Sequence, residues 1–332
     1  MHKSQITNHK SHLRGKGLWL PLSGDLEGAL EMAAAVGATH LIYRVGMRGM
    51  FFVEAARWVE GRARQAGLVP LAWVPLALND PFAEAHLVLK ALRIGYEGAV
   101  LEVRRQATGK TVAAATLARQ ILESGADPDR LYCASDPDIW RRPEIPCREL
   151  SQACQGGLMP FCFPSFRHTP QTVVEKWAYG ECIRRSQEWG RPFPIYPVLS
   201  PLQDEKTGKT VGVEEFLQWA QAVASREPAF FSVYQFGIVP RDLWPILAAM
   251  GPVPVPLPER RAEEPAPVEE PLSSATVARY HVVTVNDTIW GICNRYGITR
   301  AQFWEWNSHL WDERGLPRDE LYMEAGWRVR VG

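Results

Sequence analysis

The 332-residue sequence lacks an excess of either charge and lacks any long apolar run. Lysine plus arginine number 37 and aspartate plus glutamate also number 37, so the formal net charge is zero. A chain without a basic surplus is not expected to bind nucleic acid or an anionic membrane surface by electrostatic attraction. Because no apolar stretch reaches the ~18 residues that span a bilayer, we also expect no membrane insertion.

Cysteine is scarce, and the spacing of the cysteines matches no zinc-binding motif. The chain has six, at Cys133, Cys147, Cys154, Cys162, Cys182 and Cys293. Five of them lie in or near the expected strands and helices of one large domain, which favours reduced and mostly buried thiols. We therefore expect neither a metal ion nor another cofactor.

Between residues 17 and 251, short apolar runs alternate with longer amphipathic segments, a pattern typical of parallel strands joined by helices. The expected strands are Leu18–Leu22, His40–Val45, Val69–Leu76, Ala99–Val103, Arg130–Ala134, Leu158–Phe163, Phe193–Leu199 and Phe230–Phe236. The expected helices are Leu26–Val36, Met50–Ala66, Pro81–Arg93, Lys110–Glu123, Gln171–Trp189, Val213–Ser225 and Arg241–Met250. The segment Pro137–Ala153 holds three prolines and has room for a short helix only.

Eight strands in about 235 residues, each followed by a helix or its remnant, predict an α/β fold of the (β/α)8 TIM-barrel type. A doubly wound sheet is the alternative, but no Gly-x-Gly-x-x-Gly loop follows the first strand. Residues 1–16 are expected to form a flexible arm before the barrel domain at 17–251. Residues 252–278 are rich in proline and glutamate and predict an extended linker, which leads to a small domain at 279–332.

The small C-terminal domain follows a strand, helix, helix, strand pattern. Residues 280–282 outline a strand, and Asp287-Thr288 precedes a helix with apolar residues at helical spacing. Thr299 can cap a second helix, and residues 327–331 alternate as a closing strand. This stretch resembles a LysM domain, a small βααβ fold that binds N-acetylglucosamine-containing polymers such as peptidoglycan and chitin.

The resemblance implies a sugar groove between the strand-to-helix loop and the helix-to-strand loop. On that basis the candidate contacts are Asp287, Thr288, Ile289, Asn307 and Leu310. A second interpretation makes Asp287, Thr288 and Asn307 capping groups. The sequence departs from the family at Asn286, where glycine is usual, and at the extra residues 311–320, which could reshape the groove.

In a barrel, reacting groups come from the carboxyl ends of the strands and the loops that follow. This rule nominates Asp25, Arg44, Arg48, Trp73, Glu102, Arg104, Asp136, Asp138, Ser165, His168, Gln203, Asp204, Glu205, Tyr234 and Gln235. Glycoside hydrolysis needs two carboxyls ~5 to 9 Å apart, and Glu102 with Asp136 or Asp138 is the favoured pair. Asp136 and Asp138 have a second interpretation as turn and helix-cap residues. Trp73 and Tyr234 either line a sugar cleft or fill the barrel.

The expected barrel with its sugar-binding tail resembles the glycoside-hydrolase-like barrels of wall lytic enzymes, including the family 25 lysozymes. In those barrels the fourth strand commonly ends in Asp-x-Glu, the acid pair of the active site. Here Glu102 stands at the Asp position and Arg104 at the Glu position. Because strand side chains alternate, Glu102 and Arg104 share a face and can form an ion pair, which would lower the pKa of Glu102 and spoil it as a general acid.

Three functions are consistent with these patterns. The favoured one is a protein that binds peptidoglycan or a chitin-like glycan and carries a degenerate hydrolase barrel, because Arg104 replaces an acid. The alternatives are an active cell-wall glycosidase and a structural or assembly component of a phage-tail-like particle with a protein partner. Residues 1–10 are polar and lead into no apolar segment. We therefore expect no signal peptide, cytoplasmic synthesis, and release by lysis or on a particle.

Overall fold

The structure is a computed structural model that describes most of the chain. The described residues are 13–47, 49–138, 142–164, 167–190, 192–204, 208–251, 279–283, 289–312 and 327–332. The chain divides into two compact units, Met1–Leu257 and Pro258–Gly332.

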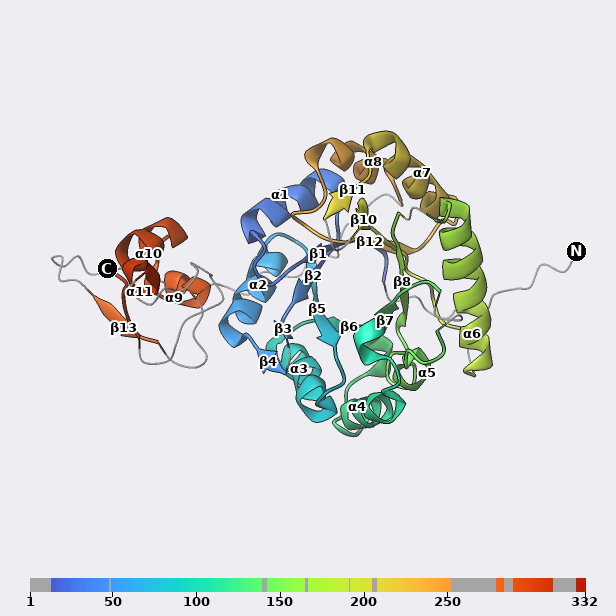
Figure 1. Ribbon diagram of the computed structural model, residues 1–332, viewed down its shortest axis with the longest axis horizontal. Coiled ribbons are helices and arrows are strands. Elements are labelled where there is room, and N and C mark those ends of the chain that lie inside the picture. The colour runs from blue at the N-terminus through green and yellow to red at the C-terminus, as the bar shows by residue number, and fades with distance from the viewer. Residues whose placement is uncertain are drawn as a thin grey trace, which may run out of the picture. The chain divides into compact units, whose positions relative to one another are not determined.

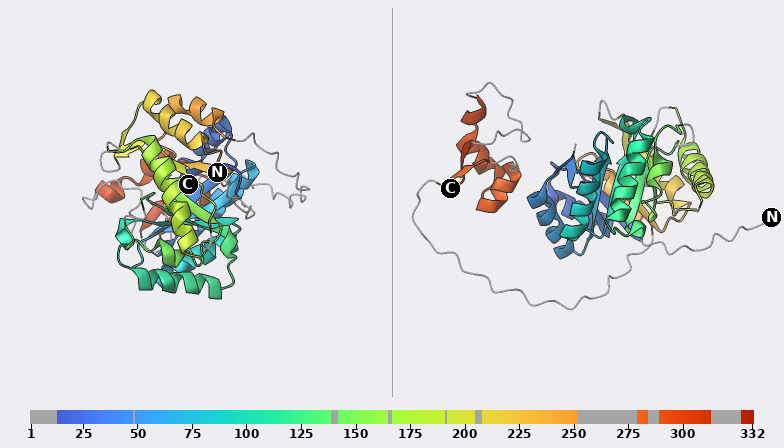
Figure 2. Two further views of the ribbon diagram at one scale, coloured as in Figure 1. Left: turned by 90° about the vertical axis from the view of Figure 1, so that its right-hand side faces the viewer. Right: turned by 90° about the horizontal axis from the view of Figure 1, so that it is seen from below.

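The first unit is a closed barrel of eight parallel strands, in the order β1-β12-β9-β8-β7-β6-β5-β2. The strands are β1 (Gly15–Leu20), β2 (His40–Arg44), β5 (Val69–Leu76), β6 (Gly98–Val103), β7 (Leu131–Ser135), β8 (Gly157–Cys162), β9 (Val198–Leu199) and β12 (Phe230–Val233). Figure 1 shows the strands as a ring enclosed by the helices, and Figure 2 shows the same arrangement from two other sides. The (β/α)8 prediction is confirmed, and the doubly wound alternative is wrong because the last strand pairs with the first.

Helices follow the strands and cover the outside of the barrel. They are α1 (Leu26–Val36), α2 (Val53–Gln65), α3 (Pro81–Ile94), α4 (Thr111–Glu123), α5 (Cys147–Leu150), the π-helix η4 (Gln171–Glu181) that continues into α6 (Cys182–Glu188), α7 (Val213–Ala224) and α8 (Trp244–Ala249). Short 3-10 turns occur at η1 (Arg105–Ala107), η2 (Pro128–Arg130) and η5 (Arg241–Leu243). The residues at the start of α3 explain why a helix begins there. The Asp80 side chain accepts a hydrogen bond from the Ala83 N–H at 3.0 Å, and Pro81 fits the first turn.

Three features differ from the sequence prediction. Strand β1 begins at Gly15, two residues before the expected start of the barrel domain at 17, and Leu13 ahead of it is already buried. Strand β9 is short because Pro194 and Pro197 cannot donate to the ladder, and Ile195 makes only an isolated bridge. The connecting loops also contain two short hairpins, β3 (Gly46–Met47) with β4 (Met50–Phe51) and β10 (Leu202–Asp204) with β11 (Lys209–Thr210).

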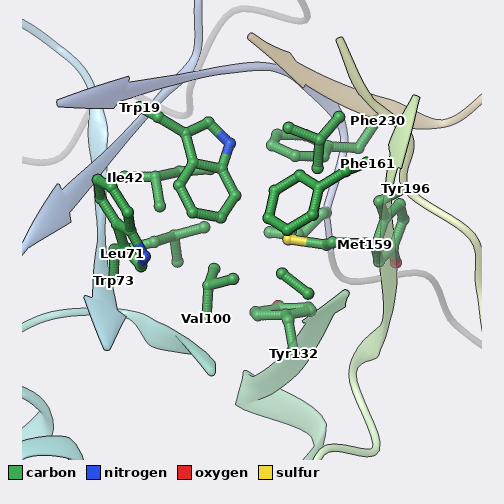
Figure 3. Packing of buried hydrophobic residues seen from close by; sticks show 13 residues of the cluster. Trp19, Ile42, Leu71, Trp73, Val100, Tyr132, Met159, Phe161, Tyr196 and Phe230 are labelled. Atoms are coloured by element: carbon green, nitrogen blue, oxygen red, sulfur yellow. The ribbon is translucent and has the colours of Figure 1, made fainter. Parts of the chain in front are cut away.

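The barrel interior is a packed core rather than a pore. Side chains alternate along each strand, so one set from every strand points inward. The inward cluster contains Leu13, Trp19, Ile42, Leu71, Trp73, Val100, Tyr132, Ala134, Met159, Phe161, Tyr196, Val198 and Phe230. Figure 3 shows how these side chains fill the space between the strands. The rings of Trp19 and Trp73 meet edge to face at 5.1 Å, and the Trp19 Nε1–H donates to Ser232 Oγ at 2.8 Å, so the one polar atom of that indole is satisfied.

At the amino end of the barrel, where the strands begin, Lys16 points outward to the ends of α1 and α8, and His40 points into the interior. The Lys16 Nζ donates to the carbonyl oxygens of Val36, Leu247 and Ala248, each at 2.9 Å. His40 is buried beside Phe230, with ring centroids 5.1 Å apart. Burial lowers the pKa of Lys16 and lowers the pKa of His40 to about 4. Both side chains are therefore parts of the folded core.

The second unit has the expected βααβ order with one extra turn of helix. Its elements are β13 (Tyr280–Val282), α9 (Ile289–Tyr296), α10 (Arg300–Asn307), α11 (His309–Asp312) and β14 (Arg328–Arg330), and the two strands pair antiparallel. Thr299 caps α10 through a reciprocal capping box with Gln302, as its position predicted. A small core holds the unit together, built from Val283, Ile289, Ile292, Cys293, Phe303, Trp327, Val329 and Val331.

Two predictions from composition can be compared with these units. All six cysteines are buried, as predicted, and none is joined to another in the structure. None of the helices in the described residues has the length and apolar character that crossing a membrane requires.

Candidate functional site

The carboxyl end of the barrel, where the strands end, brings together several of the residues nominated from the sequence. Arg44 is the last residue of β2 and stands opposite Trp73 of β5. Glu102 on β6 stands between Pro75 of β5 and Ala134 of β7 in the strand register. Arg104 and Asp136 follow two residues beyond that Glu102–Ala134 pair, so the register brings these two side chains together above the core.

Aromatic rings form the floor of this end. The Tyr234 ring lies 5.5 Å from Trp19, 5.6 Å from Trp73, 5.7 Å from Phe161 and 5.3 Å from Phe163. Tyr234 and Phe163 are partly exposed, whereas the other three rings are buried. Of the two predicted sugar contacts, Trp73 belongs to the barrel core and Tyr234 lies at the boundary between core and solvent.

Glu102 is a buried carboxyl with a defined partner. Its side chain is 5% exposed, and its Oε2 accepts a hydrogen bond from the Trp73 Nε1–H at 2.7 Å. The indole therefore fixes the orientation of this carboxyl from below. Whether Glu102 also takes the predicted ion pair with Arg104 stays a prediction.

Asp136 and Asp138 are held by two arginines. The Nε and Nη2 of Arg104 donate to Asp136 Oδ1 at 3.3 and 3.2 Å, and Arg142 Nη1 donates to Asp136 Oδ2 at 3.1 Å. Arg142 also lies 3.3 Å from Asp138 Oδ2. These four side chains are 14% to 25% exposed, so the network lies at the edge of the site. Each Asp136 oxygen already accepts from a guanidinium, and so the carboxyl is fixed as an ion-pair partner.

Arg44 differs from the other two arginines of this end. Its guanidinium lies over the Trp73 ring, 5.3 Å from the centroid, while Arg104 lies 5.2 Å over the Phe161 ring. Arg104 bonds to Asp136, but the Nε of Arg44 is buried with no hydrogen-bond partner among the described residues. The strand-end rule nominated Arg44 without giving it a role, because the absence of a partner is visible only in three dimensions.

A small cavity lies outside the barrel wall, next to β7 and β8. It has room for about 10 Å³, roughly what a single water molecule needs, and is lined by Cys133, Ser135, Asp136, Cys147, Leu158, Met159, Pro160 and Cys182. The Ser135 Oγ is buried, with no hydrogen-bond partner in the part of the chain that the structure describes. Burial raises the pKa of the Cys182 thiol, and a hydrogen bond with Cys147 together with burial raises the pKa of Cys133. Neutral thiols around so small a space do not make a substrate site.

Neither a metal site nor a hydrolase triad emerges from the described residues. In that part of the chain no group of three or more histidine, cysteine, aspartate or glutamate side chains is arranged to hold a metal ion. The His168 ring packs against the Trp177 ring at 4.5 Å. Ser165, its neighbour in sequence, lies outside the described residues.

In the second unit, the predicted sugar contacts divide into three groups. Asp287 and Thr288 lie outside the described residues. Ile289 is 2% exposed and belongs to the small core, and Leu310 packs against that core while partly exposed. Asn307 is buried, and its side-chain amide donates to the Phe303 and Arg330 carbonyls and accepts from the Arg330 N–H. Asn307 therefore ties α10 to β14, and its part in sugar binding stays a prediction.

Comparisons with known proteins identify the second unit. Residues 281–317 match the LysM domain, so the chain carries a C-terminal LysM domain. No curated protein matches the chain. The barrel is similar to active domain 2 of a thermostable chitinase from Pyrococcus furiosus, with 11% identity, a TM-score of 0.50, and coverage of 67% of this chain and 84% of that one.

A dihydrodipicolinate synthase from Rhodopseudomonas palustris is 14% identical with a TM-score of 0.39, and the match covers 67% of this chain and 70% of that one. Likeness at these identities concerns the fold alone. The barrel fits a glycoside-hydrolase-like architecture, and its chemistry has to be argued from its own residues.

Proposed function

We propose that this chain binds an N-acetylglucosamine-containing polymer, peptidoglycan or a chitin-like glycan, and that its barrel binds the glycan without cleaving it. The LysM domain supports the first half, since domains of this family bind such polymers. The observation that carries the second half is the arginine pairing of the acids at the carboxyl end of the barrel.

Most glycoside hydrolases use one carboxyl that donates a proton to the leaving oxygen and a second carboxylate on the other side of the bond. The position two residues after Glu102 on the same strand face is occupied by Arg104, a cation that cannot fill either role. Asp136 lies between Arg104 and Arg142, and Asp138 pairs with Arg142. Among the described residues, neither Asp136 nor Asp138 is therefore available to Glu102 as a second carboxyl for the reaction.

One observation favours the alternative of an active wall glycosidase. Glu102 is buried against an aromatic floor, and carboxyls in such surroundings serve as acids in many hydrolases. The hypothesis of an assembly component stays a prediction from the sequence.

Cosedimentation tests glycan binding by the full-length protein. We expect the protein to pellet with insoluble peptidoglycan or chitin and to stay in the supernatant with cellulose, which lacks the N-acetyl group. The double variant Asp287→Ala, Thr288→Ala should weaken pelleting at least tenfold if these predicted contacts bind the sugar. Glu305→Gln, at an exposed position of α10, is the matched control and should pellet like the wild type. A protein that pellets with none of the polymers, or equally with all three, would contradict the proposal.

A further inference from the structure

Besides the Ser135 Oγ at the small cavity, two polar side-chain atoms at the carboxyl end of the barrel are buried without a hydrogen-bond partner among the described residues. They are the Nε of Arg44, at the end of β2, and the Oε1 of Gln235, two residues after β12. Native structures leave few such atoms, because an unpaired buried polar group is costly. A donor on a side chain that stacks on Trp73, and an acceptor on the residue that follows Tyr234 in the chain, indicate a place where a ligand supplies the missing partners.

The orientation of Arg44 is fixed although its hydrogen bonds are not made. Stacking on the Trp73 ring holds the guanidinium, and the Trp73 Nε1–H is itself bonded to Glu102. Arg104 is stacked in the same manner on Phe161, and its N–H groups are bonded to Asp136. Both arginines are thus supported by an aromatic ring, but of the two only Arg104 has a carboxylate partner among the described residues.

The floor next to Arg44 has the character of a sugar-binding surface. The Tyr234 ring touches Trp73, on which Arg44 lies, and the partly exposed Phe163 ring packs against Tyr234 at 5.3 Å. Aromatic rings at a partly exposed site contact the apolar face of a sugar ring, while a few polar groups at the rim fix its orientation. The floor and the two unpartnered atoms therefore complement one another.

We propose that the carboxyl end of the barrel binds a saccharide that bears a carboxylate, with Arg44 as the group that receives the carboxylate. A planar guanidinium offers parallel N–H donors that match the two carboxylate oxygens. Tyr234 and Phe163 contact the sugar ring, and Gln235 Oε1 accepts from a hydroxyl or amide N–H of the ligand. This inference rests on the proposed function, since it names the class of glycan that a non-cleaving barrel recognises.

Calorimetric titration of the full-length protein tests this assignment. The probes are N-acetylmuramic acid and glucuronic acid, which carry a carboxylate on different sugars, and N-acetylglucosamine, which is neutral. We expect at least one acidic sugar to bind tenfold or more tightly than the neutral one. Tighter binding of N-acetylmuramic acid would assign the site to peptidoglycan, and equal binding of both acids would assign it to carboxylated sugars in general.

Three variants connect the preference to Arg44. Arg44→Met keeps an unbranched apolar side chain on Trp73 and should abolish the preference for acidic sugars, and Arg44→Lys should retain part of it. Arg226→Met is the matched control, because Arg226 also stacks on an aromatic ring, Tyr179 at 4.8 Å, away from the carboxyl end of the barrel. It should bind like the wild type. No acidic preference in the wild type, or an undiminished preference in Arg44→Met, would overturn the assignment.

Because the LysM domain binds the polymer independently of Arg44, failure of this assignment can be distinguished from failure of the proposed function. The contribution of the LysM domain is the same in the wild type and in every Arg44 variant, so it cancels in the comparison. Arg44→Met should still pellet with peptidoglycan or chitin through the LysM domain. Pelleting without acidic preference refutes the role of Arg44 alone, whereas loss of pelleting by the wild type refutes the proposed function.

Discussion

The two ends of the barrel hold a cationic side chain in opposite ways. At the amino end, the Lys16 ammonium donates to three carbonyl oxygens, those of Val36, Leu247 and Ala248. At the carboxyl end, the Arg44 Nε has no partner among the described residues. An ammonium has three N–H donors, so Lys16 is fully used inside the fold, whereas Arg44 retains donors for a ligand.

The contrast also appears along a single strand. On β2 three alternating residues share a face: His40, Ile42 and Arg44. The first is an imidazole that burial keeps neutral, and the last is a guanidinium. At the amino end the hydrogen bonds of the cation are thus made within the chain. At the carboxyl end we propose that a ligand makes them.

The largest expected effect is at the amino end. Lys16→Met leaves three carbonyl oxygens without their donor, and we expect a loss of about 4 kcal/mol in the free energy of unfolding of the barrel. Urea unfolding followed by tryptophan fluorescence measures it. A loss below about 1 kcal/mol would mean that water replaces the ammonium, and the two ends would then not differ as described.

His40 should make stability depend on pH. Burial lowers its pKa from 6.5 to about 4, so between these values the unfolded chain binds a proton that the folded chain does not. Stability from this group is complete above pH 6.5 and falls by about 3 kcal/mol as the pH decreases to about 4. Urea unfolding at pH 7.5 and 4.5 should show this loss, and His40→Leu should remove it. An unchanged pH dependence in the variant would contradict the assignment.

At the carboxyl end the ion-pair network should contribute less. Asp136→Asn weakens the hold on two arginines whose side chains are 22% and 25% exposed, so water compensates in part, and we expect a loss of about 1 kcal/mol. Asp138→Asn affects Arg142 alone and should cost less still. A larger loss for Asp138 than for Asp136, measured by the same unfolding assay, would show that the network is centred elsewhere.

Arg44→Met should have the smallest effect on stability. The variant loses stacking on Trp73 but also removes a buried donor that has no partner, and we expect a net change within about 0.5 kcal/mol of zero. A loss comparable with that of Lys16→Met would show that Arg44 is a structural group.

The fold was predictable because the pattern of neighbouring residues in the sequence determines where each strand and helix forms. Val69–Leu76 and Leu26–Val36 were predicted with the bounds that the structure has, since apolar runs and helical spacing are properties of neighbouring residues. The sequence predicted a longer strand than β9, because the segment is apolar. Two of its prolines cannot donate hydrogen bonds to a neighbouring strand, and so the strand is short.

The site was predictable only in part, because partners come from different strands. The sequence placed Glu102 and Arg104 on one face of one strand, but the Arg104–Asp136 pair depends on the register of β6 with β7. The unpartnered state of Arg44 depends on every element around it, and no spacing rule expresses that. For the same reason Asn307 gave no sign in the sequence that its amide links α10 to β14.

The central claim, that the barrel binds a glycan without cleaving it, is tested most directly by the release of reducing ends from purified peptidoglycan. Intact protein and Glu102→Gln are incubated with the polymer, and soluble products and pelleted protein are measured in the same tube. The account predicts that both proteins pellet with the polymer and that neither releases products above the buffer control. Release by the intact protein that disappears in Glu102→Gln would contradict it and establish a glycosidase.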